Sequence, residues 1–261
     1  MKALSTAATG MHAQQAAVDV ISNNIANANT TGFKAARIAF RDLVYDSVSR
    51  EGALTSEQGT STPVGLDIGM GVEAAGTVRL NTQGGLAATQ DDLDVAIDGS
   101  GYFVVNLPDG GQAYTRDGAF GLSAQGQLVT LLGHEIDPGI VVPDRTQKVE
   151  IGEDGVVMAY VEDDPAPVEL GRITLATFVN EGGLRPLGNN LLEATTSSGD
   201  PLQSTPGDPG VGMLRQGYLE ESNVDIIQQI TDLIKAQRAY ELNSKTIETA
   251  EQMMSAATRM R

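Results

Sequence analysis

Apolar residues recur at every seventh position near both ends of the chain. The N-terminal row is Leu4, Met11, Val18 and Ile25, and the C-terminal row is Ile226, Leu233, Tyr240, Ile247 and Met254. A seven-residue repeat keeps apolar side chains on one stripe of a helix, where a partner helix can cover them. The pattern therefore predicts two long helices that assemble with other helices. We call these nine residues, together with Ile21 and Ile230, the predicted assembly residues.

Local signals set the expected ends of these helices. The first helix is expected over residues 3–29, because residues 30–32 combine β-branching with a glycine suited to the left-handed position after a helix. The second is expected over residues 222–259, since Ser222 followed by Asp225 resembles a capping box. A second heptad row in this helix holds small or polar residues, which permit close approach or fix register: Gln229, Ala236, Asn243, Ala250 and Ala257.

Between the helices the pattern changes to short alternating or apolar runs. Turn dipeptides such as Asp98-Gly99 and Asp154-Gly155 separate them. The expected strands cover residues 93–97, 102–107, 127–132, 149–151, 156–161 and 172–179. The sequence thus predicts an α+β fold, with long N- and C-terminal helices packed as a coiled-coil-like domain and a central antiparallel β-rich domain.

Changes in composition divide the chain into three parts. Residues 1–45 and 221–261 form the predicted helical assembly domain, residues 46–80 an extended connector, and residues 81–220 the β-rich middle domain. The connector is inferred because its first 30 or so residues are rich in Ser, Thr, Gly and Glu, without a strong period.

The charge of the chain is concentrated in its middle. The net charge is −17, and residues 51–220 hold 7 of the 17 basic and 25 of the 34 acidic residues. Such an acidic surface is repelled by phosphate backbones, which argues against nucleic acid as a partner. No apolar run approaches the roughly 20 residues of a membrane span, and the N-terminus lacks the pattern of a cleaved signal peptide. We expect neither membrane insertion nor signal cleavage.

The sequence carries no strong catalytic, cofactor or metal motif. The chain has two histidines, His12 and His134, and no cysteine, so a zinc site would have to be completed by carboxylates. The acidic cluster lacks the spacing of a calcium loop, although carboxylates paired for glycoside cleavage remain open at this stage: Asp91, Asp92, Asp94 and Asp98. We predict no catalytic residue, no cofactor and no metal, and hence no enzyme.

Two terminal motifs resemble those of the bacterial flagellar rod and hook family. The segment over residues 22–34 is similar to the N-terminal signature of the family, and residues 222–225 and 237–245 to its C-terminal one. Residues 94–103 and 113–118 resemble the β domain that several members share. The motif residues that carry the likeness are Asn24, Asn27, Gly32, Phe33, Lys34, Gln237, Arg238, Tyr240 and Asn243.

The resemblance implies an axial structural protein of the flagellum. Within the family, residues 63–72 and the overall length are similar to those of distal-rod subunits, which form the rigid drive shaft across the periplasm. It implies a homopolymer exported by the flagellar type III apparatus, with proximal rod proteins, the hook or hook-base junction, and the peptidoglycan and outer-membrane ring proteins as neighbours. A proximal rod or hook subunit is the alternative within the family, and an exported cell-wall hydrolase is the alternative from another class.

Overall fold

The computed structural model describes residues 2–49, 64–162 and 166–259. These residues divide into two compact units. Unit 1 is drawn from Met1–Ala26, Ala36–Val78 and Asp225–Arg261, and unit 2 from Asn27–Ala35 and Arg79–Val224. The described residues contain two long helices and a β-rich central region, so the predicted α+β class is confirmed. Residues 50–63 of the predicted connector lie outside the described residues.

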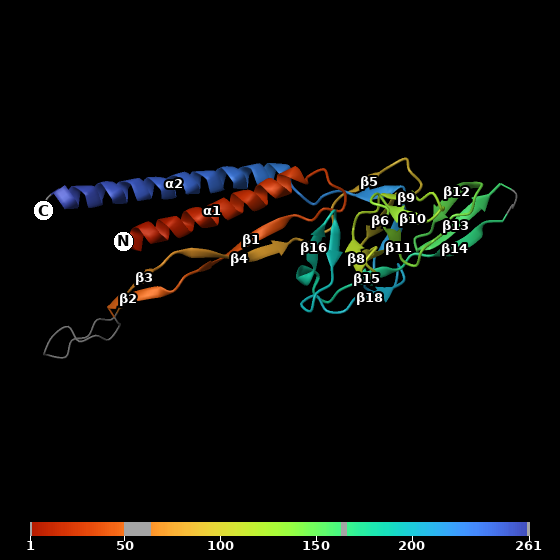
Figure 1. The fold of residues 1–261 in the computed structure, drawn as a ribbon, viewed down its shortest axis with the longest axis horizontal. Coiled ribbons are helices and arrows are strands. Elements are labelled where there is room, and N and C mark those ends of the chain that lie inside the picture. The colour runs from red at the N-terminus through yellow and green to blue at the C-terminus, as the bar shows by residue number, and fades with distance from the viewer. Residues whose placement is uncertain (1, 50–63, 163–165, 260–261) are drawn as a thin grey trace. The chain divides into compact units, whose positions relative to one another are not determined.

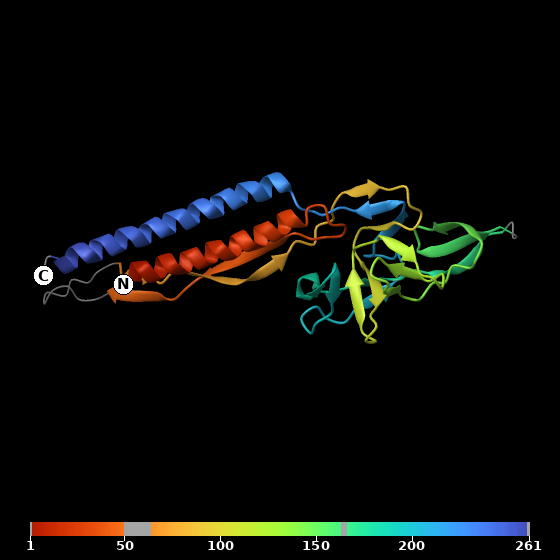
Figure 2. The same cartoon turned by 45° about the horizontal axis from the view of Figure 1, so that its top comes forward.

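Unit 1 contains both helices and a β ribbon. Helices α1 (Lys2–Ala26) and α2 (Ile226–Arg259) run antiparallel and lie side by side in both views (Figures 1 and 2). The ribbon comprises two pairs of strands, β1 with β4 and β2 with β3: Ala36–Asp42, Val72–Arg79, Tyr45–Ser49 and Leu66–Gly69. Strands β3 and β4, and all of β2 except Tyr45, lie in residues that the sequence assigned to an extended connector.

Helix α1 ends earlier than its heptad pattern indicates. Its last residue is Ala26 rather than residue 29. Asn27 starts a turn in which its carbonyl accepts the Thr30 N–H at 3.2 Å and its Oδ1 accepts the Thr30 hydroxyl at 3.1 Å. Because these local bonds offer the backbone an alternative to the helix, the side chain of Asn27 stops α1 one turn before the glycine does.

Helix α2 begins later than predicted, and its cap is a different residue. Asp225 Oδ1 accepts the N–H groups of Ile227 and Gln228 at 2.9 and 3.1 Å, and its carbonyl accepts the Gln229 N–H at 2.9 Å. These are the contacts of an N-cap. Ser222 was expected to fill that position; instead its Oγ accepts the Val224 N–H at 3.4 Å within an extended segment. Asp225, the acidic residue of the predicted capping box, is therefore the N-cap residue of α2.

Unit 2 is built from antiparallel strands. Its largest sheet has nine strands, ordered β16-β17-β8-β7-β11-β10-β9 with β15 between β7 and β18: Arg185–Gly188, Leu191–Glu193, Gln112–Thr115, Tyr102–Asn106, Glu135–Ile136, Leu128–Thr130, Phe120–Leu122, Leu175–Thr177 and Leu202–Ser204. A second sheet holds β12 (Thr146–Ile151), β13 (Val156–Val161) and β14 (Val168–Arg172). The remaining pairs are β6 with β19 and β5 with β20: Val95–Asp98, Met213–Gln216, Leu86–Ala88 and Tyr218–Glu220. A short 3₁₀ helix covers Glu181–Gly183. Every sequence-predicted strand overlaps one of these strands.

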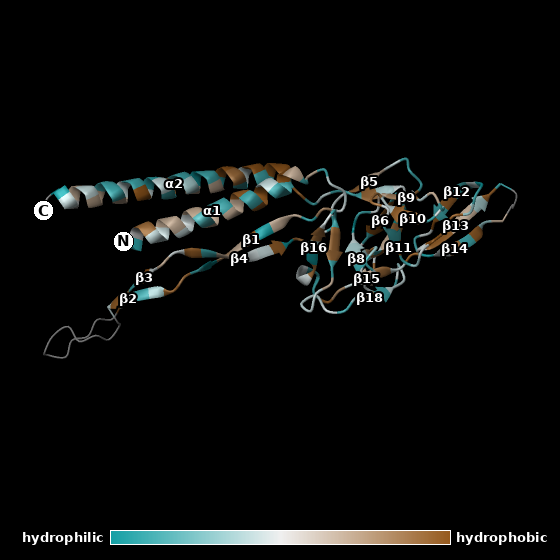
Figure 3. Ribbon diagram, in the orientation of Figure 1, coloured by the Kyte–Doolittle hydropathy of each residue, from teal (hydrophilic) through white to brown (hydrophobic). Residues whose placement is uncertain are grey.

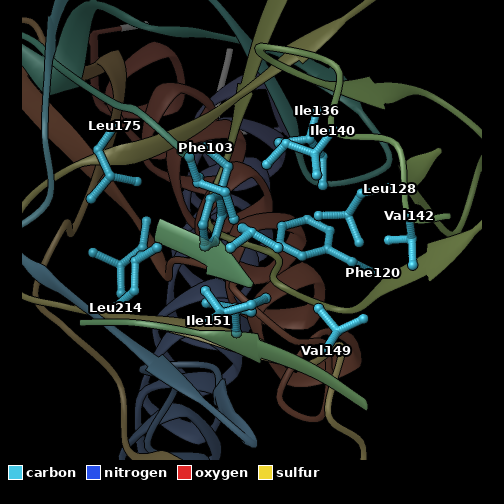
Figure 4. Packing of buried hydrophobic residues seen from close by; sticks show 14 residues of the cluster. Phe103, Phe120, Leu128, Ile136, Ile140, Val142, Val149, Ile151, Leu175 and Leu214 are labelled. Atoms are coloured by element: carbon cyan, nitrogen blue, oxygen red, sulfur yellow. The ribbon is translucent and has the colours of Figure 1, made fainter. Parts of the chain in front are cut away.

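Strand β7 is buried on both of its faces, which explains its uninterrupted apolar run. Phe103 contributes to the main core, where its ring meets Phe120 edge to face with centroids 4.9 Å apart (Figure 4). Tyr102 and Val104 point to the other face, into a smaller core with Tyr114 and four other residues: Ala176, Phe178, Leu184 and Leu192. Two hydrophobic cores thus share one central strand.

Candidate assembly site and the contacts that support it

The two helices of unit 1 contact each other through small and polar residues at heptad spacing. Asn24 Nδ2 donates to Gln229 Oε1 at 3.0 Å, and fourteen residues away in each helix a Cβ added to Gly10 would lie 2.8 Å from Asn243 Nδ2. Close approach at Gly10 requires the absence of a side chain. Midway between these pairs, Ala17 and Ala236 are also buried. The weaker heptad row of α2 is thus the one that packs on α1.

The predicted assembly residues are left at least partly open by this packing. Four residues of α2 remain 41–45% exposed: Ile226, Ile230, Tyr240 and Met254. The others are only half-buried: Leu4, Met11, Val18, Ile21, Ile25, Leu233 and Ile247. Single exposed apolar residues are ordinary, whereas rows of them are typical of interaction surfaces.

One hollow in unit 1 joins predicted assembly residues from both ends of the chain. Val18 of α1 and Tyr240 of α2 line a space of about 400 Å³, together with Gln15, Gln237 and Glu241. Figure 3 shows that the apolar residues of α2 are concentrated in its first half, while hydrophilic residues become frequent toward its end. The hollow lies between an aliphatic and an aromatic side chain and has a polar rim, so it can receive an apolar side chain.

Asn24, from the N-terminal motif, is a buried polar residue whose amide both donates and accepts hydrogen bonds. Its side chain is 1% exposed, and its Nδ2 donates to the carbonyl of Ala36 at 2.7 Å as well as to Gln229. The Ala36 N–H donates to Asn24 Oδ1 at 2.9 Å. Burying an amide is costly unless it is hydrogen-bonded, so this position selects asparagine for its paired donor and acceptor.

Gly32, from the same motif, takes a backbone conformation that other residues rarely adopt. Its φ is +66°, and a Cβ there would lie 2.7 Å from the carbonyl carbon of Arg116 and the amide of Asp117. Its N–H donates to the carbonyl of Glu220 at 2.8 Å, while the Phe33 N–H closes the turn onto Thr30 at 3.3 Å. Gly32 is therefore required both for its left-handed conformation and for close backbone contact.

Lys34 belongs to a buried charge cluster in unit 2. Its Nζ donates to Glu220 Oε1 at 2.5 Å and to the carbonyl of Thr82 at 2.9 Å. The Arg116 guanidinium donates to Glu220 Oε2 at 3.3 Å, and the Gly84 N–H donates to Oε1 at 2.9 Å. The side chains of Lys34, Arg116 and Glu220 are no more than 5% exposed.

Burial dominates the electrostatics of this cluster. It lowers the pKa of Lys34, because removal of the ammonium from water disfavours its charged form, although the hydrogen bond from Lys34 to Glu220 opposes that shift. Arg116 also lies over the Tyr102 ring, with its Cζ 5.2 Å from the ring centroid. Removal of one partner would leave an uncompensated charge inside the protein, which is strongly destabilising.

Asn223 provides a second polar junction next to this cluster. Its Oδ1 accepts the Ala35 N–H at 2.7 Å. Its Nδ2 donates to the carbonyl groups of Leu80 and Thr82 at 2.8 and 2.9 Å. Asn223 therefore joins two segments of unit 2 that are far apart in the sequence.

The C-terminal motif residues lie on α2 and have different surroundings. Gln237 and Tyr240 line the hollow, and Asn243 packs against Gly10. Arg238 lies on the exposed surface of α2. Sequence reasoning identified Lys34 through the motif but missed Glu220 and Arg116, since an isolated charge in a strand or loop has no periodicity that marks it as buried.

The acidic cluster of unit 2 has structural contacts. Asp91 Oδ1 accepts the Leu93 N–H at 3.0 Å, and Asp98 pairs with Arg215 at 2.9 Å. Among the described residues, no group of three or more His, Asp or Glu side chains is placed to hold a metal ion. Within the same ranges, neither helix combines the length and apolar character that a membrane crossing requires.

Three family models match successive parts of the chain. The model described as Flagella basal body rod protein matches residues 4–34, and the model described as Flagellar hook protein FlgE/F/G D1 domain matches residues 96–159. The model described as Flagellar basal body rod FlgEFG protein C-terminal matches residues 215–260. The two terminal matches include all the predicted assembly residues.

Relatives match over the full length. The chain is 48% identical over 261 residues to the flagellar basal-body rod protein FlgG of Caulobacter vibrioides, with 100% of both chains covered. It is 47% identical over 255 residues to the FlgG of Agrobacterium fabrum, covering 98% of this chain and 97% of the relative. It is 36% identical over 259 residues to the FlgG of Bacillus subtilis, covering 97% of each chain.

Proposed function

Because this chain belongs to the flagellar basal-body rod protein family, we propose that it is a structural subunit of the distal rod, which polymerises into the tubular drive shaft between motor and hook. The observation that carries the proposal is the full-length match, since it includes both terminal motifs and the β-rich middle in their order. Members of this family are structural proteins, and their function is to form a rigid assembly.

The open faces of the two helices supply the contacts between subunits. In the polymer, the predicted assembly residues pack in a coiled-coil-like manner against helices of neighbouring copies. A large apolar side chain that passes from exposed to fully buried contributes roughly 1.5–3 kcal/mol, and a half-exposed one correspondingly less, so the driving force is the sum over several such residues per subunit. The small residues between α1 and α2 leave these larger side chains available.

The position of the subunit in the flagellum implies its neighbours. Proximal rod proteins lie below the distal rod, the hook or hook-base junction above it, and the peptidoglycan and outer-membrane rings around it where the rod crosses the periplasm. The type III export apparatus delivers the chain. Support for these partners comes from the family rather than from any contact in the structure.

Replacement of exposed apolar residues in α2 tests the proposal. Ile230→Ser combined with Tyr240→Ser should stop rod extension in cells that carry only this variant, because both side chains are more than 40% exposed in the monomer and are proposed to be buried in the polymer. Electron microscopy of isolated basal bodies measures rod length. The free energy of unfolding of the variant monomer should stay within about 0.5 kcal/mol of that of the unmodified chain, as is usual for surface substitutions.

The matched control replaces two exposed leucines of unit 2 in the same way. Leu131→Ser with Leu132→Ser, at side chains that are 78% and 55% exposed, should leave rod length unchanged. Full-length rods from the α2 variant would contradict the proposed assembly surface. Full-length rods in cells that lack the chain altogether would contradict the proposed function.

A further inference from the structure

The chain passes between unit 1 and unit 2 at four points. These are the peptide bonds after residues 26, 35, 78 and 224. If the chain is a rod subunit, as proposed above, a force applied to one unit reaches the other at least in part through these four backbone segments. Segments that are joined by hydrogen bonds share an applied force, whereas unconnected segments can be extended one after another.

In unit 1, the side chain of Asn24 forms hydrogen bonds that connect residues near three of these four points. Asn24 lies two residues before Ala26, the last residue ahead of the first point, and its amide binds both the N–H and the carbonyl of Ala36, the first residue after the second point. The same amide holds Gln229, which follows the fourth point by five residues. One buried side chain thus connects three segments within unit 1.

In unit 2, Glu220 and Asn223 make an equivalent set of connections. The Glu220 carboxylate binds the ammonium of Lys34, which lies just before the second point. It also accepts the N–H of Gly84, which follows the third point by six residues. Asn223, next to the fourth point, holds the N–H of Ala35 and the carbonyl of Leu80. The Leu80 N–H also donates to the carbonyl of Ala35 at 2.8 Å.

We propose that Asn24 in unit 1 and the Glu220–Asn223 pair in unit 2 are two clamps that make the crossing segments respond to force together. Each clamp consists of polar side chains that bind groups of distant segments; Asn24 and Glu220 are buried, and Asn223 is half-buried. Such bonds resist separation strongly, since an opened clamp leaves buried donors and acceptors without partners. The four crossing segments of the rod subunit then carry torque together rather than one at a time.

Amide hydrogen exchange of the full-length chain, followed by NMR, tests whether the clamps hold their segments. Asn24→Ala should speed exchange of the Ala36 N–H by about tenfold or more, because the bond to its Oδ1 is lost. Glu220→Gln replaces the carboxylate that accepts the Gly84 N–H by a neutral amide oxygen, which is a weaker acceptor, and should speed exchange of that N–H by a smaller factor. Asn29→Ala and Glu221→Gln, at exposed neighbouring positions, are the matched controls and should leave both rates unchanged. Equal rates in clamp and control variants would overturn the proposal.

Swimming under load tests whether the clamps serve a mechanical role. Cells with Asn24→Ala or Glu220→Gln should assemble rods of normal length but lose a larger fraction of their speed in a polymer-thickened medium than cells with the control variants. The same fractional loss in all four strains would assign the bonds to folding alone and overturn the mechanical proposal.

A conservative variant covers the case in which Asn24→Ala does not fold. Asn24→Asp keeps the acceptor for the Ala36 N–H but loses both donated bonds, to Gln229 and to the Ala36 carbonyl, so it should show the same load sensitivity with a smaller change in exchange of the Ala36 N–H. Normal swimming in cells lacking the chain would instead refute the proposed function, while the exchange experiment would still decide whether the clamps exist.

Discussion

At the scale of single residues, buried polar side chains distinguish this protein from an ordinary β-rich domain. Asn24, Lys34 and Glu220 are no more than 7% exposed, and each binds groups distant in sequence. The motif pointed to Asn24, Gly32 and Lys34, but not to their partners. A sequence of 34 acidic residues does not show that Glu220 is the buried one, because burial of a charge depends on partners that only the fold brings together.

Tyr102 makes the stability of unit 2 sensitive to alkaline pH. Burial, with the nearby carboxylate of Glu181, raises the pKa of its phenol above the ordinary 10.0. As pH rises past 10.0 the unfolded chain loses this proton while the folded chain keeps it, so stability that is fully present below that pH is lost above it. The expected slope is about 1.4 kcal/mol per pH unit.

Tyr102→Phe should remove the loss of stability that the Tyr102 phenol causes at alkaline pH. Denaturant unfolding between about pH 8 and pH 11 measures it, and the variant should show a flatter decline than the unmodified chain. Tyr45→Phe, at a ring that is 57% exposed, serves as the control and should retain the original slope. A Tyr102→Phe profile parallel to the original would contradict the assignment.

At the scale of elements, periodicity predicted which segments are helical but not which face packs. The heptad rows placed α1 and α2 correctly to within a few residues, since a seven-residue repeat is a property of the sequence alone. The contact between the helices depends instead on Gly10, Ala17 and Ala236, whose small size allows close approach. Strands β2–β4 had weak patterns because most of their side chains are exposed.

The start of α2 offers a direct choice between two caps. Asp225→Ala should lower the free energy of unfolding by about 1 kcal/mol, because two first-turn N–H groups lose their acceptor. Ser222→Ala should have a smaller effect, since its hydroxyl accepts only one N–H at 3.4 Å. Thermal unfolding monitored by far-UV circular dichroism measures both, and a larger loss for Ser222→Ala would restore the capping-box interpretation.

At the scale of the whole molecule, the two units draw on distant parts of the chain. The sequence division placed residues 1–45 together, whereas residues 27–35 belong to unit 2. Composition does not change at residue 27, so the assignment of residues 27–35 to unit 2 could not be predicted from the sequence. It follows from the contacts that Gly32 and Lys34 make with Glu220.

Two N-terminal deletions distinguish these boundaries. Removal of residues 1–26 takes away α1 and should leave unit 2 close to its original stability, while polymerisation is lost. Removal of residues 1–35 also takes Lys34 from the buried cluster, and should lower the free energy of unfolding of unit 2 by about 3 kcal/mol or more. Near-UV circular dichroism of the aromatic core during denaturant unfolding measures the difference; equal stability of the two products would contradict it.

The long sequence separation of these contacts has a consequence for the order of folding. Lys34 and Glu220 are 186 residues apart, and Asn24 and Gln229 are 205 apart. Contacts of such high sequence separation form late, because the intervening loop must close first. A chain synthesised from its N-terminus cannot finish either unit until residues 220–229 are present. An interrupted chain would therefore lack both junctions, and only a complete one can present finished surfaces to the growing end of the polymer.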